Sequence, residues 1–509
     1  MAPVDDALAE VAKLEKELSR RRDDIQRHVD YYDGKQPLAF ASEQYRDWFG
    51  DQYSGFADNW CAPVVDAMTE RLRLMGVRPR EATKVDSQLR QWWEESGAAA
   101  DSPLAFGTMA TSRRVFALVW DDGDDEGVPE VTFEDPRQAI VCYEAGSRRK
   151  RRSALKRWSD DEFDYATLYT PDFVWKFQRQ RLGAAVGGLE LPESTRASLA
   201  GWQPRQAAGD DAWPIPNPLG VVPMVEIQNR PKLLGQPLSE ISGVIAMQDA
   251  INALWAYLFT AADFAALPQR VILGAQLPKI PVLNENGQKI GEKPLDLPDA
   301  NVKRILNLEG PDAKIGQWDS ANLDAFTGVI EKAANHIGNQ TKTPLYYFAS
   351  SIQNISGDTL KALDSGLVAK VGERMETSDE AIREIHRLMA LVAGDETLAR
   401  AVRGGTVIWA DHEVRSEAQK VDALAKLKEI GFPFEYIAER YVGGDADELE
   451  RLMRMYKAQI REDPLMMLAQ REKQLDREAA QKGKDEVDPE DEGGEKKPPA
   501  KKKAEADEQ

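Results

Sequence analysis

Hydrophobic residues recur at steps of three and four along much of this chain, which is the spacing of one apolar face of an α-helix. The pattern predicts helices over residues 321–340 and 356–394, on either side of a polar and aromatic loop at 341–355. Two long helices thus enclose a short, largely uncharged loop. The pattern alone indicates an ordinary connection between helices.

Local signals predict where these two helices begin and end. Pro344 requires the first helix to end before it, because the residue ahead of a proline is disfavoured in the helical conformation. Ser356 is typical of a helix-capping residue, and Asp358 in the first turn suits the positive end of the helix dipole. The polar cluster 378–380 leaves open a kink or a restart in the second helix.

Helical periodicity predicts most of the remaining elements. A wide apolar face at 238–267 predicts another long helix, and a charged helix is expected over residues 1–30. Further helices are expected at 59–72, 85–96, 98–112, 418–430, 433–442 and 445–471. Beyond residue 482 the chain is rich in Lys, Glu, Asp and Pro with few apolar residues, which predicts a disordered tail.

Between residues 114 and 178 the hydrophobic period changes to two, which is typical of strands that bury one face. Short runs rich in β-branched and aromatic residues, separated by turn residues, predict an antiparallel β subdomain. The expected strands are at 116–120, 130–134, 139–144, 154–158, 165–169 and 173–177. A later run at 406–411 predicts a lone strand, whose simplest partner is this same subdomain.

A small insert is predicted between the helices at 238–267 and 321–340. Residues 268–320 contain strand-like runs, and Asn286–Gly287 is typical of a tight turn. The expected strands are at 271–275, 279–283 and 304–308. The sequence therefore predicts a helix–insert–helix hairpin whose two helices are each apolar on one side, so each needs a neighbour.

The length and the charge of the chain limit its architecture and its partners. With 509 residues it is too long for one ordinary hydrophobic core, so two or more domains are expected. Its formal net charge of −20 argues against a protein that grips nucleic acid with its whole surface, because tight binding needs a basic face. An acidic protein can still let DNA pass without holding it.

Cysteine usage and hydropathy limit the compartment in which the protein is made. Cys61 and Cys142 follow no disulfide or zinc-binding pattern, so a reducing compartment is expected. The N-terminus lacks the apolar core of a signal peptide, and the most hydrophobic run, 250–262, is shorter than the roughly 20 residues of a membrane span. We expect a soluble protein, made inside the cell and without a membrane contact.

Motifs for catalysis, cofactors and metals are missing from the sequence. It has no phosphate-binding loop, dinucleotide fingerprint, metalloprotease helix or nucleophile elbow, and its four histidines are scattered. The acidic loop that starts at Asp122 resembles the beginning of an EF-hand, but its twelfth position is Phe133 instead of Glu, so no calcium site is expected. We expect no enzyme activity, no cofactor and no metal. The alternative is that the chain is an enzyme, but no catalytic site can be named for it.

Two basic clusters are exceptions in this acidic chain. One is Arg20–Arg22 near the end of the first helix, and the stronger one is the run 148–152 between two predicted strands. Such runs are typical of solvated surface, and the alternative is a contact with nucleic acid or an acidic partner.

Three blocks of residues, taken in order, carry a resemblance to a known family. The first is YYDGKQPL (31–38) with NWCAPVVDAMTERLRLMGV (59–77), and the second runs from FEDPRQAIVCYE (133–144) through DYATLYTPD (164–172). The third is TPLYYF (343–348), NISGDTLKALDSGLVAKV (354–371) and VIWADHEVRSEAQKVDALAKLKEIGFPFEYI (407–437). Together they resemble the portal, or head-to-tail connector, proteins of tailed double-stranded DNA bacteriophages of the siphophage type.

The resemblance implies an α+β, portal-like fold. It has a wing of helices and an antiparallel β subdomain, a stem of two long helices, a small α/β clip, a tunnel loop and a helical crown. The implied parts are an N-terminal arm at 1–24, the wing at 25–237 with a returning strand at 395–411, the stem at 238–267 and 321–340, the clip at 268–320, the tunnel loop at 341–355, a long helix at 356–394, the crown at 412–470 and a charged, disordered tail at 471–509.

The resemblance also implies a function and its partners. Portal subunits form a ring, usually dodecameric, which is the conduit for DNA at one capsid vertex. The terminase motor packages the genome through this ring, the genome is later ejected through it, and head-completion and tail proteins attach to it. The implied partners are further copies of the chain, double-stranded DNA, the terminase large subunit, the major capsid protein, a head-completion adaptor and a scaffolding protein. The implied location is the portal vertex of the virion, after assembly in the host cytoplasm.

Two sets of site residues follow from the resemblance. The tunnel loop would face DNA with Lys342, Tyr346, Tyr347, Phe348, Ser351, Gln353 and Asn354, and the clip would contact the motor or adaptor with Lys279, Asn286, Gly287, Lys289 and Lys293. The alternative for Tyr346 and Phe348 is packing against the neighbouring helix, since aromatic side chains are often buried. The alternative for the whole chain is another virion structural protein, such as a minor capsid or adaptor component.

Overall fold

A computed structural model of the chain describes most of its length. The described residues are 4–36, 56–121, 123, 128–181, 201–205, 213–266, 270–273, 279–283, 287–294, 314–317, 323–348, 357–413, 417–442 and 446–462. They fall into two compact units, Met1–Glu417 and Ala418–Gln509. The expected disordered tail lies outside the described residues.

Helices of the first unit follow the predicted periodicity closely. In chain order they are α1 (Val4–Tyr32), α3 (Cys61–Thr69), α4 (Ser87–Glu95), α5 (Ala98–Ser112), α7 (Ile245–Ala266), α8 (Asp324–Thr341), α9 (Gly357–Val392) and α10 (Glu396–Arg403). Two differences stand out: α10 has no counterpart among the predicted helices, and α7 begins at Ile245 because residues 241–244 form turns.

The six strands predicted between 114 and 178 are confirmed, but they belong to two antiparallel sheets. The first sheet has the order β10 (Met224–Gln228), β2 (Arg114–Asp121) and β3 (Pro129–Glu134). The second has the order β4 (Ala139–Tyr143), β5 (Arg151–Ser159), β6 (Phe163–Tyr169), β7 (Phe173–Gln180) and β8 (Gln203–Pro204), with β9 (Ile215–Pro216) also paired to β7. The hydrophobic pattern did not predict β10.

The returning strand pairs elsewhere than expected. The strand β15 (Thr406–Trp409) lies antiparallel to β1 (Leu74–Arg78), with Val77 opposite Val407. The prediction that it joins the earlier β subdomain was therefore wrong. Gly76 lies inside β1, with φ 141°.

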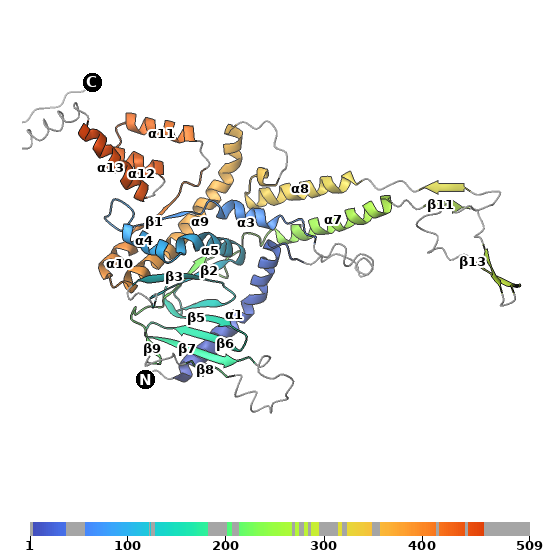
Figure 1. Cartoon of the computed structure of the whole chain (residues 1–509), viewed down its shortest axis with the longest axis horizontal. Helices are drawn as coiled ribbons and strands as arrows, with labels where there is room; N and C mark the ends of the chain where they lie inside the picture. Colours follow the sequence, from blue (N-terminus) through green and yellow to red (C-terminus); the bar gives the residue numbers. More distant parts are fainter. Residues whose placement is uncertain are drawn as a thin grey trace, which may run out of the picture. The chain divides into compact units, whose positions relative to one another are not determined.

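Helix α1 packs across the second sheet (Figure 1). Its buried stripe packs with sheet residues such as Ile140, Leu155 and Trp175 in one hydrophobic cluster. The stripe consists of Ala7, Val11, Leu14 and Leu18. The helix continues without a break through residue 24, so the implied boundary between arm and wing falls inside one helix.

The largest hydrophobic core is built around α9, which is one continuous helix of 36 residues. No restart occurs at 378–380 because each polar residue there has a place on the helix. Ser378 is buried, Asp379 accepts a hydrogen bond from Trp409 Nε1 at 2.8 Å, and Glu380 pairs with Arg149 at 2.8 Å.

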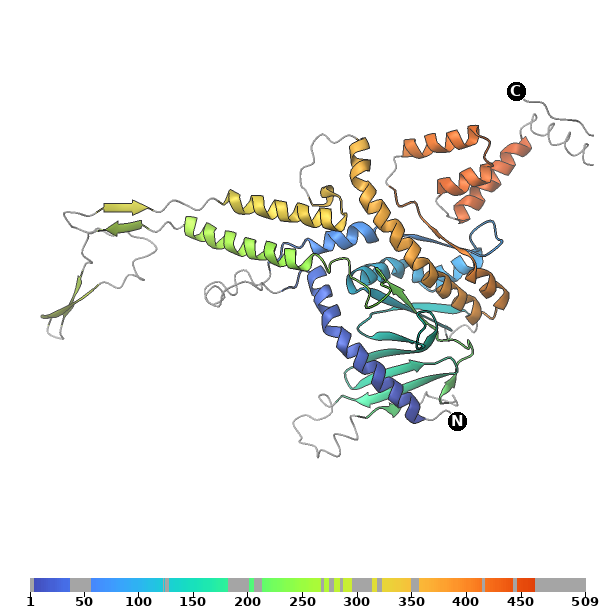
Figure 2. The ribbon, with the colours of Figure 1, turned by 180° about the vertical axis from the view of Figure 1, so that it is seen from behind.

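The helices α7 and α8 run side by side in both ribbon views (Figures 1 and 2). The chain between them contains the antiparallel pairs β11 (Arg270–Leu273) with β14 (Lys314–Gln317) and β12 (Lys279–Leu283) with β13 (Lys289–Pro294). The strand expected at 279–283 is confirmed. The strand expected at 304–308 lies outside the described residues.

The second unit contains three helices among its described residues. They are α11 (Glu417–Glu429), α12 (Phe434–Val442) and α13 (Ala446–Glu462), close to the predicted ranges. The rings of Phe434 and Tyr456 stack 3.8 Å apart and join α12 to α13.

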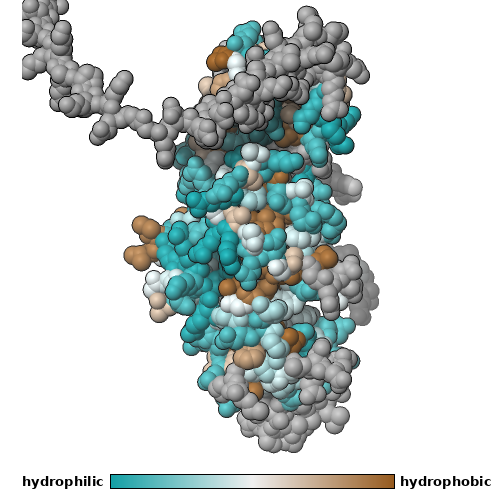
Figure 3. Space-filling model, turned by 90° about the vertical axis from the view of Figure 1, so that its left-hand side faces the viewer, coloured by the Kyte–Doolittle hydropathy of each residue, from teal (hydrophilic) through white to brown (hydrophobic). Residues whose placement is uncertain are grey.

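The face of the molecule drawn in Figure 3 is mostly hydrophilic, with hydrophobic residues scattered over it. Within the described ranges, no helix is long and apolar enough to span a membrane. Cys61 and Cys142 are both free, and burial raises the pKa of the Cys61 thiol to about 12, so this buried thiol stays protonated.

Candidate functional site

The segment 341–348, which joins α8 to the chain before α9, begins with a sharp change of direction. Lys342 adopts the left-handed conformation (φ 57°), and Thr343 N–H donates to the Gly338 carbonyl at 2.9 Å. Pro344 follows and leads into the 3₁₀ turn η2 (Leu345–Tyr347). Lys342 alone is exposed within this segment. The helix end therefore presents one cation to the outside.

A buried ion pair holds the 3₁₀ turn. Arg71 Nη1 and Nη2 lie 2.8 and 2.9 Å from the two carboxylate oxygens of Asp364, and both side chains are 9% exposed. The Tyr346 hydroxyl accepts a hydrogen bond from Arg71 Nη2 at 3.0 Å and donates one to Asp364 Oδ1 at 2.8 Å. Burial raises the pKa of Tyr346, and the hydrogen bond to Asp364 raises it further, so the hydroxyl keeps its proton.

The other aromatic side chains of the segment also pack within the subunit. The Phe348 ring lies 5.5 Å from the Trp60 ring, and the Tyr347 ring lies 4.8 Å from the Tyr346 ring. A Cβ at Gly338 would come within 3.1 Å of Phe348 Cε2, so this glycine makes room for the ring. Of the two expectations for Tyr346 and Phe348, the structure shows the packed one; a DNA contact by these rings stays a prediction.

A second buried network ties the end of α8 to α9. Glu240 Oε2 lies 3.0 Å from Lys370 Nζ, and Glu240 Oε1 lies 2.9 Å from Arg374 Nε, with all three side chains at most 5% exposed. Lys370 Nζ also donates to the Thr341 carbonyl at 3.2 Å. Burial raises the pKa of Glu240, but Lys370 and Arg374 outweigh this and lower it, so the carboxylate stays charged.

Sequence reasoning missed both networks, although a signal for the second one was present. Lys370 and Arg374 each lie one position before an apolar residue, Val371 and Met375, of the buried face of α9. Charged residues beside an apolar stripe are usually solvated, so the signal becomes clear only when a buried Glu240 lies opposite them.

The remaining predicted loop residues, Ser351, Gln353 and Asn354, lie outside the described residues. Of the clip residues, Lys279, Gly287 and Lys289 are exposed at the β12–β13 hairpin, where Gly287 has φ 77°. Lys279 and Lys289 Nζ lie 3.7 and 2.6 Å from Glu292, so one carboxylate partly neutralises both. Lys293 lies in β13, but its side chain is outside the description. Asn286 lies outside the described residues.

The basic run 148–152 is bound within the subunit. Arg149 and Arg151 lie 2.8 and 2.5 Å from Glu380 and Glu384 of α9, and Arg152 lies 2.5 Å from Glu10 of α1. Lys150 pairs with Glu144 at 3.7 Å, and Arg148 donates to the Lys232 carbonyl. These contacts tie β5 to α1 and α9, which favours a structural role over a nucleic-acid site.

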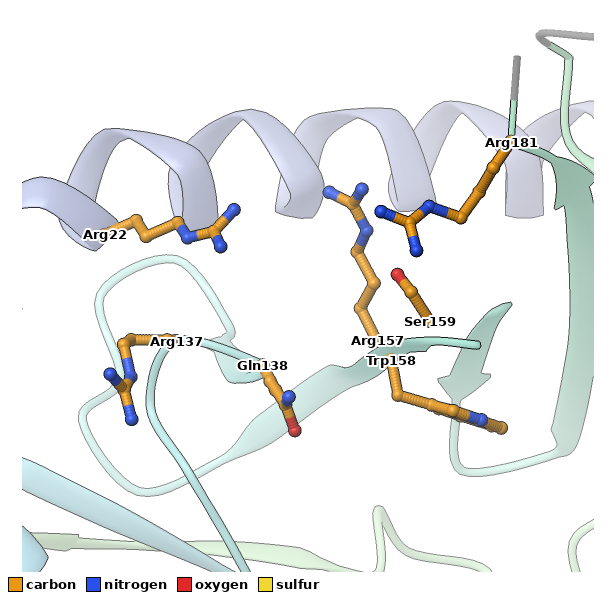
Figure 4. A pocket seen from close by; sticks show the side chains of 7 residues that line it. All are labelled: Arg22, Arg137, Gln138, Arg157, Trp158, Ser159 and Arg181. Atoms are coloured by element: carbon orange, nitrogen blue, oxygen red, sulfur yellow. The ribbon is translucent and has the colours of Figure 1, made fainter. Parts of the chain in front are cut away.

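A pocket of about 300 Å³ lies between α1 and the second sheet (Figure 4). Its lining comprises Arg22, Arg137, Gln138, Arg157, Trp158, Ser159 and Arg181. Figure 4 shows the Arg157 and Arg181 guanidinium groups close to one another. Carboxylates pair with arginines of this lining: Arg157 with Glu15 at 2.8 Å and Arg137 with Asp135 at 2.7 Å.

Among the described residues, no cluster of three or more His, Cys, Asp and Glu side chains could hold a metal ion. The arrangement at 341–348 thus offers one exposed cation on a rigidly anchored segment, and the described contacts around it are structural ones. Fold and site together are those of a mixed helix and antiparallel-sheet protein with two long paired helices around an insert.

Comparison with known proteins identifies the family. Residues 11–462 match the family model described as "Phage portal protein, SPP1 Gp6-like", so the chain belongs to this family of phage portal proteins. The portal protein of Mycobacterium phage L5 is 29% identical over 381 residues, which cover 71% of this chain and 70% of that protein. The portal protein of Mycobacterium phage D29 is 27% identical over 378 residues, with the same coverage of both proteins.

Chains of two solved structures also match this chain, at low sequence identity. A chain of "Neck of native GTA particle computed with C12 symmetry" matches with a TM-score of 0.38 and 12% identity, over 78% of this chain and 92% of that one. A chain of "Virion of native gene transfer agent (GTA) particle" matches with a TM-score of 0.34 and 13% identity, over 74% of this chain and 86% of that one.

Proposed function

We propose that this portal protein forms a ring-shaped conduit for double-stranded DNA at one vertex of a phage capsid. The observation that carries the proposal is the family match across residues 11–462. In the ring, which is dodecameric, the chain contacts further copies of itself and the major capsid protein. The terminase large subunit packages the genome through the ring, and a head-completion adaptor binds later. A scaffolding protein is a further partner. The ring is assembled in the host cytoplasm and stays at the portal vertex of the virion.

The proposed parts are assigned to the elements of the fold. The wing comprises α1 to β10 with β15, the stem comprises α7 and α8, and the clip comprises β11 to β14. The segment after α8 faces the channel, and α11 to α13 form the crown. The exposed clip residues Lys279, Gly287 and Lys289, with Asn286 and Lys293, contact the motor or the adaptor.

The electrostatics of the chain suit a conduit that must release what it contacts. Each phosphate that a protein neutralises adds a salt-dependent attraction, which would slow the passage of DNA. The chain carries a net charge of −20, and within 341–348 Lys342 is the one cation. Each subunit then offers DNA a single weak contact, and a ring of subunits repeats it around the channel.

Ring formation is the first expected outcome. Native mass measurement of the purified protein should give a closed oligomer of about twelve subunits, in line with closed cyclic symmetry. Negative-stain images should show a ring with a central hole. A monomer or dimer under every assembly condition, or images without a ring, would contradict the proposal; a different closed assembly would favour another virion structural protein.

Reversing the charge of Lys342 should impair DNA packaging more than ring assembly. In Lys342→Glu each subunit places an anion where DNA phosphates pass, at a Coulomb cost of about 1 kcal/mol per close contact in water. We expect roughly a 10-fold loss of packaged, nuclease-protected DNA, since a change of ~1.4 kcal/mol corresponds to a factor of ten. Ring assembly is measured in the same preparation by counting rings in electron micrographs.

Lys428→Glu is the matched control for this experiment. Lys428 is an exposed lysine of α11, so the substitution changes the net charge equally without touching the channel segment. It should leave packaging unchanged. Equal loss of packaging and of ring assembly in Lys342→Glu would contradict a channel role for this segment.

A further inference from the structure

The two ends of the connection between α8 and α9 are joined by hydrogen bonds through one hydroxyl group. Tyr346 lies in η2, just after α8, and Asp364 lies 18 positions later on α9, yet the hydroxyl and the carboxylate are 2.8 Å apart. Arg71, from the turn between α3 and β1, completes a closed triad with both of them. Residues distant in sequence thus meet at one point directly beside the channel segment.

The triad is built so that the ion pair does not depend on the tyrosine. Arg71 and Asp364 make two mutual hydrogen bonds of 2.8 and 2.9 Å, which satisfy the charges of both side chains. Tyr346 adds one accepted and one donated hydrogen bond to this pair. Its hydroxyl contributes little to joining α3 and α9, which the ion pair already joins. The Tyr346 hydroxyl instead attaches the 3₁₀ turn to Arg71 and Asp364.

Besides Tyr346, the segment is attached by Lys370, by an interaction of Tyr347 with Arg71 and by an apolar contact. Lys370 Nζ holds the Thr341 carbonyl at 3.2 Å, and Phe348 packs on Trp60 with ring centroids 5.5 Å apart. Lys342 lies between these polar contacts, exposed and in the left-handed conformation. The position of Lys342 therefore depends on polar contacts on both sides of it. Lys370 holds the chain before it at Thr341, and Tyr346 holds the 3₁₀ turn after it.

We propose that Tyr346 is a positioning residue for the channel segment. Its hydroxyl, bound at once by Arg71 and Asp364, fixes residues 341–348 to the body formed by α3 and α9, so that Lys342 stays in one place while DNA passes. This inference rests on the proposed function, because it requires that the segment faces the channel. It assigns Tyr346 a structural hold on the segment instead of a direct contact with DNA.

Tyr346→Phe is the test, because it removes the hydroxyl and keeps the ring, the ion pair and the packing. The loss of a hydrogen bond to a charged group should raise the population of the detached segment by a factor on the order of 10 or more. Hydrogen exchange in the assembled ring should become faster by about this factor at the Tyr347 and Phe348 amides, which donate to Pro344 and Leu345. Packaged DNA per particle should fall several-fold while the number of rings is unchanged.

The matched control is Tyr436→Phe, which removes a hydroxyl from a half-exposed tyrosine of α12. It should change neither exchange at 347–348 nor packaging. Unchanged exchange in Tyr346→Phe, or faster exchange with normal packaging, would overturn the positioning role. Lys342→Glu separates this failure from that of the proposed function: if Lys342→Glu impairs packaging and Tyr346→Phe does not, only the positioning role fails, and if neither does, the channel assignment fails.

Discussion

Replacing Glu240 by alanine is expected to destabilise the first unit by about 3–5 kcal/mol, because the change leaves Lys370 buried without its anion and Arg374 with only the exposed Glu373. Lys370 and Arg374 are 5% and 4% exposed, and Glu240 is the carboxylate that both contact. Asn229 Nδ2, 3.1 Å from Glu240 Oε1, loses a partner as well. Every tryptophan of the chain lies before residue 410, so tryptophan fluorescence during urea unfolding reports on this unit.

Two further variants make this measurement specific. Glu240→Gln keeps a hydrogen-bonding side chain but removes the charge, so its loss of stability should fall below that of Glu240→Ala. Glu396→Ala breaks the 2.6 Å pair with Arg400, whose side chains are 71% and 80% exposed, and should cost no more than about 1 kcal/mol. Equal losses for Glu240→Ala and Glu396→Ala would show that the buried network does not hold the chain before α7 to α9.

Acid should destabilise the same unit, because the buried His386 resists protonation. Between pH 6.5 and pH 4 this group should lower the free energy of unfolding by about 3 kcal/mol. Its ring is fully buried and stacks on Trp93 at 5.0 Å, and Nδ1 lies 2.9 Å from the Ile382 carbonyl. Nε2 has no hydrogen-bond partner among the described residues. Burial lowers the pKa of His386 to about 4, although the Ile382 carbonyl and the charge of Asp86 oppose this.

The sign follows from which state binds the proton. The folded pKa of His386, about 4, lies below its ordinary value of 6.5, so between these values the unfolded chain takes up a proton that the folded chain refuses. The contribution of His386 to the stability is therefore complete above pH 6.5 and is lost as the pH falls towards 4. Below pH 4 this group changes the stability little further.

His386→Phe tests this prediction, since it keeps an aromatic ring beside Trp93 but cannot titrate. The difference in free energy of unfolding between pH 7.5 and pH 4 should shrink by about 3 kcal/mol relative to the unmodified protein. Carboxylates such as Glu240 titrate in both proteins, so their effect cancels in the comparison. Identical pH dependence in the two proteins would contradict a neutral, buried His386.

The candidate site was only partly predictable from the sequence. The pattern placed a tight segment after the helix that ends at Thr341, and it identified Lys342 as the sole cation of the loop 341–355. It left open whether Tyr346 and Phe348 are packed, because aromatic residues occur both in cores and at contact surfaces. Their packing depends on Arg71 and Trp60, which lie more than 270 positions earlier and which no local pattern connects to them.

The basic run 148–152 is a second feature whose role could not be predicted from local sequence. Five consecutive cations are a strong signal in an acidic chain, and local sequence cannot tell solvation from partner binding. Their partners are Glu380 and Glu384 on α9, Glu10 on α1 and Glu144 nearby. Only the approach of three distant elements turns an apparent binding patch into part of the scaffold.

The sequence by itself determined the elements: the helix–insert–helix hairpin, the six strands after residue 114 and the long helix from 357 to 392, with the blocks that indicated a portal protein. This is possible because amphipathic period and turn residues are local properties of the chain. The tertiary structure alone decided that β15 pairs with β1, that Lys370 and Arg374 face a buried carboxylate, and that Tyr346 is bonded to an ion pair. Each of these joins residues far apart in sequence, and the free energy that selects them arises only when both sides are removed from water together.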